Sequence, residues 1–325
     1  MGRLAIVIPS VGSVEALEGT LLSVLENRPS RCEVLVVHTH AYSDPYQLEG
    51  EVRFLRAPAK SSFVACANLG VRETSADFVH LLAAGCQVRE GWTDGVLRHF
   101  ADPRVAVVAP LLVDEQDPSR ALAASITYGV GGVRRSRAQP LAAVQERGVS
   151  PILAAGLAAV FYNRVTLSTV GYLSNEVGAD LADVDLGLLL RHAGFMSLVD
   201  PRSQVLAPGR PLESQGALRR ALRAERLFWR NAPLVGWLRS IIAHPLAVTT
   251  DVARGFPSPA MMSRFVGRLI GAAMISSVRR HHQRLGDLRN AAPVPAADGV
   301  TRHVRIDRAH DEKSGRKAGE AARVA

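Results

Sequence analysis

Residues 4–10 read LAIVIPS, an apolar run rich in β-branched residues that reaches a proline at position 9. We expect a strand over Leu4–Ile8 that stops at Pro9, followed by a helix that Ser13 caps. Two further short runs, at Glu33–Val37 and Asp77–Leu82, are also mostly apolar and are expected to be strands. Strands that alternate with helices are typical of βαβ units. The first 112 residues therefore predict an α/β fold with a mostly parallel sheet flanked by helices.

The same reasoning extends over the rest of the chain. Further strands are expected at Val52–Arg56, Val105–Val113, Leu157–Asn163 and Phe195–Val199. Helices are expected at Phe63–Glu73, Glu90–Phe100, Val165–Val170, Leu181–His192, Ala217–Arg230, Leu234–Ala243 (ended by Pro245) and Ala260–Arg280. Residues 114–152 contain several glycines and the cluster Arg134-Arg135-Ser136-Arg137. We expect a long loop or lid there.

The composition places the chain among globular proteins. It has 325 residues, of which 47% are hydrophobic and 5% aromatic, and this excludes a disordered or fibrous protein. Cys32, Cys66 and Cys86 lack metal-type spacing and are typical of reduced thiols in a cytoplasmic protein. No run of about 18 uncharged apolar residues is present, so a membrane-spanning helix is not expected.

The basic charge is concentrated in one segment. The whole chain has a formal net charge of +9. Residues 210–284 hold 13 basic and 3 acidic residues, a net charge of +10, whereas residues 1–209 hold 18 basic and 21 acidic residues, a net charge of −3. Because the arginines of Ala217–Arg230 fall on one helix face, we expect the helices of 217–280 to meet an anionic membrane surface. The alternative is a solvated face packed on the globular domain. No nucleic-acid-binding motif is present.

These differences divide the chain into three parts. Residues 1–209 are expected to form the α/β domain, and residues 210–285 a basic helical extension. Residues 286–325 are rich in Ala, Pro, Arg and Asp and are expected to be disordered. We expect a cytoplasmic protein, and peripheral attachment to the inner face of the cell membrane follows if the helical extension contacts lipid.

Several dispersed segments resemble one enzyme family. The chain is similar to family 2 glycosyltransferases, in their rhamnosyltransferase-type branch, at Ile6–Ser10, Glu33–Val37, Phe63–Val71, Asp77–Leu82, Glu90–Trp92, Ala101–Val105, Gly156–Asn163, Asp183–Leu186 and Arg191–Phe195. The resemblance covers roughly residues 3–235 in order and spacing. It implies the GT-A fold, in which a mostly parallel sheet binds a nucleotide-diphospho-sugar at the carboxyl ends of its strands.

The resemblance also implies a reaction. Family members transfer a sugar, with inversion, from a nucleotide-diphospho-sugar to a glycan or lipid-linked acceptor, which suggests a role in the synthesis of cell-surface polysaccharide. Asp183 matches the general base that takes a proton from the acceptor hydroxyl, and Asp185 lies in the same acidic motif. Capping and the helix dipole also favour an acidic residue at a helix start, so a structural role for Asp183 stays open.

The expected donor-binding residues lie mostly in loops at the carboxyl ends of the strands. They are Pro9, Ser10, His38, Asn68, Gly85, Arg134 and Arg135. His38 stands where the family has acidic residues that contact the nucleobase. We interpret His38 as a residue that contacts the nucleobase. The alternative is that His38 and His40 are ordinary polar residues of the loop. Asn68 matches a common family asparagine, with packing as its alternative role.

The expected metal motif is missing. The family carries an Asp-containing motif after the fourth strand that holds a divalent cation on the diphosphate, and Ala83, Ala84 and Gly85 occupy those positions. Mg²⁺ and Mn²⁺ need oxygen ligands, so we expect no metal site and no certain cofactor, with arginines of 134–137 as clamps on the diphosphate. The competing hypothesis is a catalytically inactive relative that binds a glycan, a nucleotide or a partner enzyme at the membrane.

Overall fold

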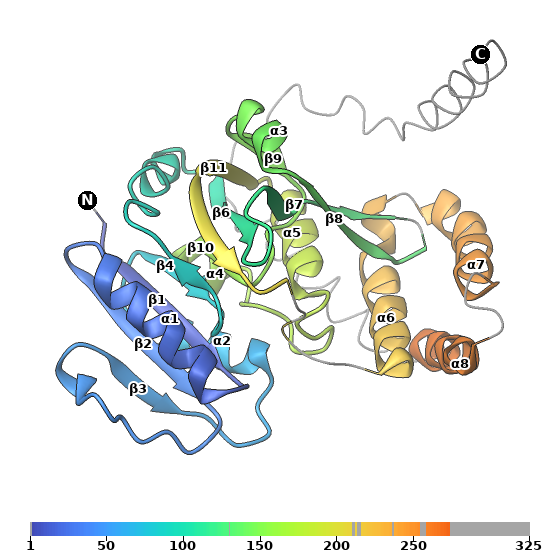
Figure 1. Ribbon diagram of the computed structural model, residues 1–325. Coiled ribbons are helices and arrows are strands. Elements are labelled where there is room, and N and C mark those ends of the chain that lie inside the picture. Colours follow the sequence, from blue (N-terminus) through green and yellow to red (C-terminus); the bar gives the residue numbers. More distant parts are fainter. Residues whose placement is uncertain are drawn as a thin grey trace, which may run out of the picture. The chain divides into compact units, whose positions relative to one another are not determined.

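The computed structural model describes residues 2–129, 131–209, 212, 216–235, 237–253 and 258–273 (Figure 1). The expected disordered tail, residues 286–325, lies outside the described residues, as do residues 274–280 of the last expected helix. The described residues all fall in one compact unit, which contains both the sheet and the C-terminal helices. The domain boundary at residue 209 stays a prediction.

A single sheet organises the fold. The strand order is β3-β2-β1-β4-β10-β6-β11-β5. The strands are β1 Leu4–Ser10, β2 Cys32–His38, β3 Arg53–Arg56, β4 Phe78–Leu82, β5 Gln87–Val88, β6 Val105–Asp114, β10 Ala159–Asn163 and β11 Met196–Ala207. The pairs β3–β2, β2–β1, β1–β4 and β6–β11 are parallel, and β10 runs antiparallel between β4 and β6. The expected mostly parallel core is confirmed.

The helices are α1 Val14–Asn27, α2 Phe63–Glu73, α3 Leu141–Glu146, α4 Arg164–Thr169, α5 Ala182–His192, α6 Ala217–Val235, α7 Trp237–Ala253 and α8 Pro259–Ala273. Helices α1 to α5 pack against strands of the sheet, whereas α6, α7 and α8 pack mainly on one another, with α6 also in contact with α5. The expected cap is present, since Ser13 Oγ accepts the backbone N–H of Ala16 at 3.1 Å. A side-chain oxygen at this position satisfies a backbone donor that has no partner inside the helix.

The core lies around β1. All seven residues of β1 are buried, and burial of one Val, Leu or Ile side chain contributes about 1.5–3 kcal/mol. Helix α2 lies directly against this strand at Gly70, where a Cβ atom would collide with Val7 and lie 3.1 Å from Val37 Cγ2. Close packing of α2 on β1 and β2 holds the carboxyl ends of these strands in place.

Two expectations for the N-terminal half are wrong. Strand β1 continues through Pro9 to Ser10, because Pro9 pairs in register with Val37 and its carbonyl accepts the N–H of Ala84 at 3.4 Å. A proline can end a parallel strand in this way because it still supplies an acceptor. The α-helix expected at Glu90–Phe100 is a series of turns with a 3₁₀ helix at Leu97–Ala101. Gly91 has a φ of +75° there, which α-helical geometry does not allow.

The long loop expected over residues 114–152 is also wrong. The segment forms the hairpin β7 Arg120–Tyr128 and β8 Arg134–Pro140, followed by α3 and the short strand β9 Ser150–Ile152. Most side chains of β8 are exposed, so the strand carries no alternation of apolar and polar residues. Pairing with β7 stabilises it instead, and sequence periodicity does not detect such a strand.

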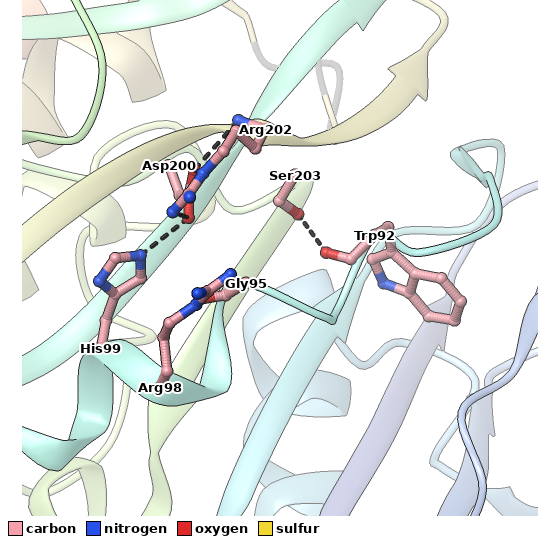
Figure 2. A network of polar contacts seen from close by, with 7 residues as sticks. All are labelled: Trp92, Gly95, Arg98, His99, Asp200, Arg202 and Ser203. Carbon is pink, nitrogen blue, oxygen red and sulfur yellow. Dashed lines mark hydrogen bonds and ion pairs between the residues drawn. The ribbon is translucent and has the colours of Figure 1, made fainter.

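Strand β11 runs eight residues past its expected end at Val199. Its pairing with β6 is irregular between Asp200 and Gln204, and Figure 2 shows the contacts that hold this bulge. Asp200 is fully buried, with Oδ2 2.8 Å from His99 Nε2 and 3.0 Å from Arg202 Nη2. Ser203 Oγ donates to the carbonyl of Trp92 at 2.5 Å. The bulge is therefore tied to the connection between β5 and β6.

The helix expected to end before Pro245 does not end there. Helix α7 continues to Ala253 with Pro245 inside it. The preceding residue, His244, is buried and stacks on Phe228 of α6 with ring centroids 3.5 Å apart. Its Nε2 lies 2.9 Å from Glu225 Oε1. These tertiary contacts hold α7 at the point where proline disfavours a helix.

Candidate functional site

A cavity of about 1000 Å³ lies at the carboxyl ends of β1 and β4. Here the chain changes direction across the sheet, with β2 on one side of β1 and β4 on the other. In open α/β sheets ligands bind at such a point. The β7–β8 hairpin, the start of α5 and helices α6 and α8 form the remaining walls; representative lining residues are Pro9, Ala83, Arg134, Asp183, Ala221 and Arg264.

Asp183 lies on the wall of this cavity in the first turn of α5. It is 4% exposed, and Leu181, not Asp183, is the N-cap residue of the helix. Its Oδ1 accepts the N–H of Val184 at 2.7 Å. The residue that matches the general base therefore faces the cavity without capping the helix.

Arg134 of β8 forms an ion pair with Asp183. Its Nε lies 2.9 Å and its Nη2 2.7 Å from Oδ2 of the carboxylate. Burial raises the pKa of Asp183 above its ordinary value, although the Arg134 guanidinium acts in the opposite direction. A carboxylate with a raised pKa is a stronger base, provided that it is deprotonated at the working pH.

Asp185 is oriented differently. It does not line the cavity, and it is 2% exposed between α5 and α6. Its Oδ1 lies 3.3 Å from Arg230 Nε and 3.4 Å from Asn231 Nδ2. Arg230 was expected on a membrane-facing side of its helix, and it is instead buried in this contact. The geometry gives Asp185 an anchoring role for α6.

Three arginines of the C-terminal helices line the cavity together with Arg134. They are Arg220 of α6 and Arg264 and Arg268 of α8. Asp180 and Asp183 are the acidic residues of the lining in the part of the chain that the structure describes, so four arginines face two aspartates there. Arg135 is exposed on β8 and is not part of the lining. The sequence did not predict that Arg220, Arg264 and Arg268 line the cavity, although Arg264 and Arg268 are four residues apart on a mostly apolar helix.

The end of β4 presents two alanines to the cavity. Ala83 and Ala84 line it, whereas Gly85 turns away with a φ of +98°. The N–H of Gly85 donates to Ala16 O at 2.9 Å and to Thr20 Oγ1 at 2.8 Å. Within the described residues, no group of three His, Cys, Asp or Glu side chains could hold a metal ion.

The remaining predicted donor residues lie around the ends of β1 and β2. Pro9 lines the cavity, whereas Ser10 and His38 are buried, pair with each other in the register of β1 and β2, and are not part of the lining. His38 Nδ1 lies 2.7 Å from the carbonyl oxygen of His40, and Tyr42, whose ring is 6.2 Å from that of His38, stacks on Phe54 with centroids 5.4 Å apart.

Asn68 lies away from the cavity, inside the core. Its amide donates to Leu173 O at 2.8 Å and its carbonyl accepts Leu173 N–H at 3.1 Å. Both halves of the side chain are used in joining α2 to the segment after α4. This geometry corresponds to the packing role.

Sequence comparisons detect only short stretches of relatives. No protein-family model matches the chain. A pre-mycofactocin glycosyltransferase of Mycobacterium tuberculosis is 36% identical over 63 residues, which is 19% of this chain and 13% of that protein. A probable N-acetylgalactosaminyltransferase 9 of Caenorhabditis elegans is 25% identical over 83 residues, which is 26% of this chain and 14% of that protein. The chain thus matches only a small part of these curated relatives.

Solved structures resemble almost the whole chain. GalNAc-T7 with UDP, GalNAc and Mn²⁺ aligns with a TM-score of 0.59 at 13% identity, over 91% of this chain and 59% of that one. The mannosyltransferase PcManGT of Pyrobaculum calidifontis, in complex with GDP-Man and Mn²⁺, aligns with a TM-score of 0.51 at 15% identity, over 88% and 85%. The chain has the GT-A fold. The expected fold class is thereby confirmed, and the rhamnosyltransferase-type branch stays a prediction.

A divalent cation, as held by both GT-A neighbours, does not fit the residues present here. Ala83 and Ala84 have no donor atoms in their side chains, and Asp183 is already bound by Arg134. Mn²⁺ and Mg²⁺ prefer several carboxylate or other oxygen ligands at one place.

Proposed function

We propose that the chain is a glycosyltransferase that moves a sugar from a nucleotide-diphospho-sugar to a hydroxyl group of a glycan or lipid-linked acceptor. One observation carries the proposal: Asp183 is a buried carboxylate on the cavity wall at the switch point of a GT-A sheet. The two solved neighbours contain UDP and GDP-Man, which supports a nucleotide-sugar as the donor. A role in cell-surface polysaccharide synthesis is part of the proposal.

Transfer with inversion requires one displacement at the anomeric carbon. The acceptor oxygen forms a bond to this carbon, and the bond from the carbon to the diphosphate oxygen breaks. The acceptor proton passes to the carboxylate of Asp183, and the nucleoside diphosphate leaves with the electron pair. Arg134 fixes the orientation of the carboxylate through its two contacts, and such positioning lowers the barrier.

The surface of α8 supports a lipid-linked acceptor. Its exposed side chains Met262, Phe265, Val266, Leu269 and Ile270 are apolar and recur at helical spacing. The opposite face carries Gly267 and Gly271 and packs against α6; an added Cβ at Gly271 would lie only 2.7 Å from Leu222 O. The helix therefore turns its arginines inward and its apolar residues outward.

We propose that an anionic lipid bilayer covers this apolar face. Met262 is 61% and Leu269 56% exposed, and Leu246 of the neighbouring α7 is 72% exposed. The segment that carries them has a net charge of +10 over residues 210–284, which favours a negatively charged surface. No helix in the described parts of the chain is long and apolar enough to span a bilayer. Contact of α8 with lipid would bring a lipid-linked acceptor to the mouth of the cavity.

Vesicle sedimentation tests this contact. Full-length protein should pellet with vesicles that contain phosphatidylglycerol, and the double variant F265S/L269S should lose at least tenfold in partitioning. L22S is the matched control, because Leu22 is 60% exposed on α1. Equal sedimentation of F265S/L269S and L22S would overturn the contact. A shift of the double variant from dimer to monomer with unchanged vesicle binding would assign the face to a second copy.

The observation that favours the second candidate, an inactive binding module, is the pairing of Asp183 with Arg134. A guanidinium at 2.7 Å neutralises the carboxylate, and the alanines at the end of β4 add no catalytic group. A binding module would hold a nucleotide, a glycan or a partner enzyme at the membrane without turnover.

Product analysis distinguishes the two candidates. Wild-type protein is incubated with a panel of UDP-, GDP- and dTDP-sugars and with lipid-linked and free glycan acceptors, and release of the nucleoside diphosphate is measured. The proposed function predicts release that depends on the acceptor and a product of inverted anomeric configuration. Binding of a donor without any release across the panel would favour the binding module.

A further inference from the structure

We infer that Arg220, Arg264 and Arg268 of the C-terminal helices bind the diphosphate of the donor and take the place of a divalent cation. The inference rests on the proposed function and names the groups that hold the phosphates. It also makes α6 and α8 part of the site, although they lie outside the segment predicted to be the catalytic domain.

The cavity has a net positive charge. Among the described residues, its charged lining consists of four arginines and two aspartates, a net charge of +2. These arginines converge on one space from three elements, β8, α6 and α8. The diphosphate of a nucleotide-sugar carries negative charge on both phosphates, and the planar fork of Arg binds two phosphate oxygens at once.

Arg264 is the arginine most available to a ligand. It lines the cavity and is partly buried, and it forms no ion pair with any residue in the part of the chain that the structure describes. Asp183 and Asp180, the acidic residues of the lining, lie near Arg134 and Arg220 respectively. A cation held at the edge of a cavity without a partner is suited to an anion that arrives from solution.

Arg268 and Arg220 line the same cavity as Arg264. Arg268 is 6% exposed, and its Nη1 lies 3.0 Å from Glu225 Oε2, which fixes the guanidinium at the cavity wall. Gly132 of the β7–β8 turn leaves room for it, because an added Cβ there would lie 3.1 Å from Arg268 Nη1. Arg220 Nε is 3.8 Å from Asp180 Oδ2 and its side chain is 60% exposed, so its guanidinium is largely free to reorient.

The arginines expected to bind the diphosphate are less suited to it. Arg134 is engaged by Asp183 through two nitrogens, and Arg135 is exposed outside the cavity. The alanines at the end of β4 leave the phosphates without an oxygen-bound cation. The C-terminal helices supply the positive charge that remains, and the geometry points to a metal-independent donor site.

Calorimetric titration of the full-length protein tests this assignment by binding, without any need for turnover. The probes are UDP, GDP and inorganic pyrophosphate, each titrated in EDTA and in Mn²⁺. The structure predicts that at least one probe binds in EDTA, with an affinity that Mn²⁺ changes by less than about threefold. R264Q should weaken that affinity roughly tenfold to hundredfold, the range for a lost charge-assisted hydrogen bond.

Matched variants separate charge from folding. R219Q is the control, because Arg219 is exposed on α6 and does not line the cavity, and it should bind like wild type. R264K keeps the charge without the fork and should bind with intermediate affinity. Unchanged thermal unfolding of R264Q shows that the fold is intact; if R264Q unfolds early, R220Q serves as the second test.

Each result decides the assignment. Binding that requires Mn²⁺, equal affinity of R264Q and R219Q, or no binding of any probe in either buffer would overturn it. Sugar transfer that depends on Mn²⁺ would leave the proposed function standing and refute the arginine site. Metal-independent binding that R264Q weakens, without transfer to any acceptor, would support the arginine site and refute the proposed function.

Discussion

Arg134 binds Asp183 through two guanidinium nitrogens, with Nε 2.9 Å and Nη2 2.7 Å from Oδ2. The two residues are 49 positions apart in the sequence and come from the β7–β8 hairpin and from α5. The hairpin therefore sets the orientation of the carboxylate that we assign as the base. The contact joins two separate elements at the cavity, and it lowers the pKa of Asp183 against the larger, opposite effect of burial.

Removal of the arginine should destabilise the protein. R134Q leaves Asp183 buried without its counter-charge, and we expect a loss of roughly 3 kcal/mol in the free energy of unfolding. The loss should be smaller in acid, because a protonated Asp183 needs no counter-charge. Urea denaturation at pH 8 and pH 5 measures both values. The double variant R134Q/D183N should regain most of the stability; if it stays as unstable as R134Q, the pair is not the cause.

The pH dependence of transfer should follow Asp183. Burial raises the pKa of Asp183 despite Arg134, and the base must be deprotonated to accept a proton. The rate should therefore fall as the pH drops through a value above 3.8, the ordinary pKa of the carboxyl. R134Q removes the guanidinium that lowers the pKa, so its acidic limb should move to higher pH in a profile of kcat/KM. A limb at the same pH in both proteins would assign it to another group.

The contact between Asp185 and Arg230 should hold α6 on α5. Both side chains are largely buried, so R230Q leaves the Asp185 carboxylate buried without the Arg230 guanidinium, at a cost of about 3 kcal/mol. Hydrogen exchange followed by mass spectrometry should show faster exchange in α6. R219Q, on the exposed face of the same helix, should exchange at the wild-type rate. Equal exchange of R230Q and R219Q would show that other contacts hold the helix.

The bulge of β11 should be sensitive to acid. Burial alone would raise the pKa of Asp200, but hydrogen bonds from Arg202 and His99 lower it to about 2. A carboxylate with a lowered folded pKa adds stability above the unfolded pKa of 3.8 and loses it as the pH falls toward 2. The wild type should lose about 2 kcal/mol more than D200N between pH 5 and pH 2. Parallel stability curves for the two proteins would contradict this assignment.

Local sequence signals predict the part of the fold around β1. The β-branched run of residues 4–10, the cap at Ser13 and the pattern of Phe63–Glu73 each correspond to an element of the structure. These signals act over a few residues, because a buried strand or a capped helix needs particular side chains at each position. Asp183, which the sequence indicates as the candidate base, also lies at the cavity.

Tertiary contacts determine the features that local sequence signals did not predict, namely the path of α7 and the direction of the α8 arginines. Helix α7 passes Pro245 because His244 is held by Phe228 and Glu225. The direction in which Arg264 points depends on Gly267 and Gly271, which pack on α6 and turn the arginine side of α8 toward the cavity. A helical pattern of apolar and basic residues does not show which face is turned inward, so the sequence predicts membrane contact for these helices without placing Arg264 and Arg268 at the cavity.

The rate of transfer by D183N tests the central claim most directly. Wild type, D183N and D102N are compared with the same donor and acceptor at saturating concentrations; Asp102 is paired with Arg104 at the surface and lies outside the cavity lining. We expect D183N to lose at least about a hundredfold in kcat, the size of a general-base contribution, with donor affinity kept within about threefold, while D102N transfers at the wild-type rate. Equal kcat for D183N and D102N would contradict the assignment of Asp183 as the general base.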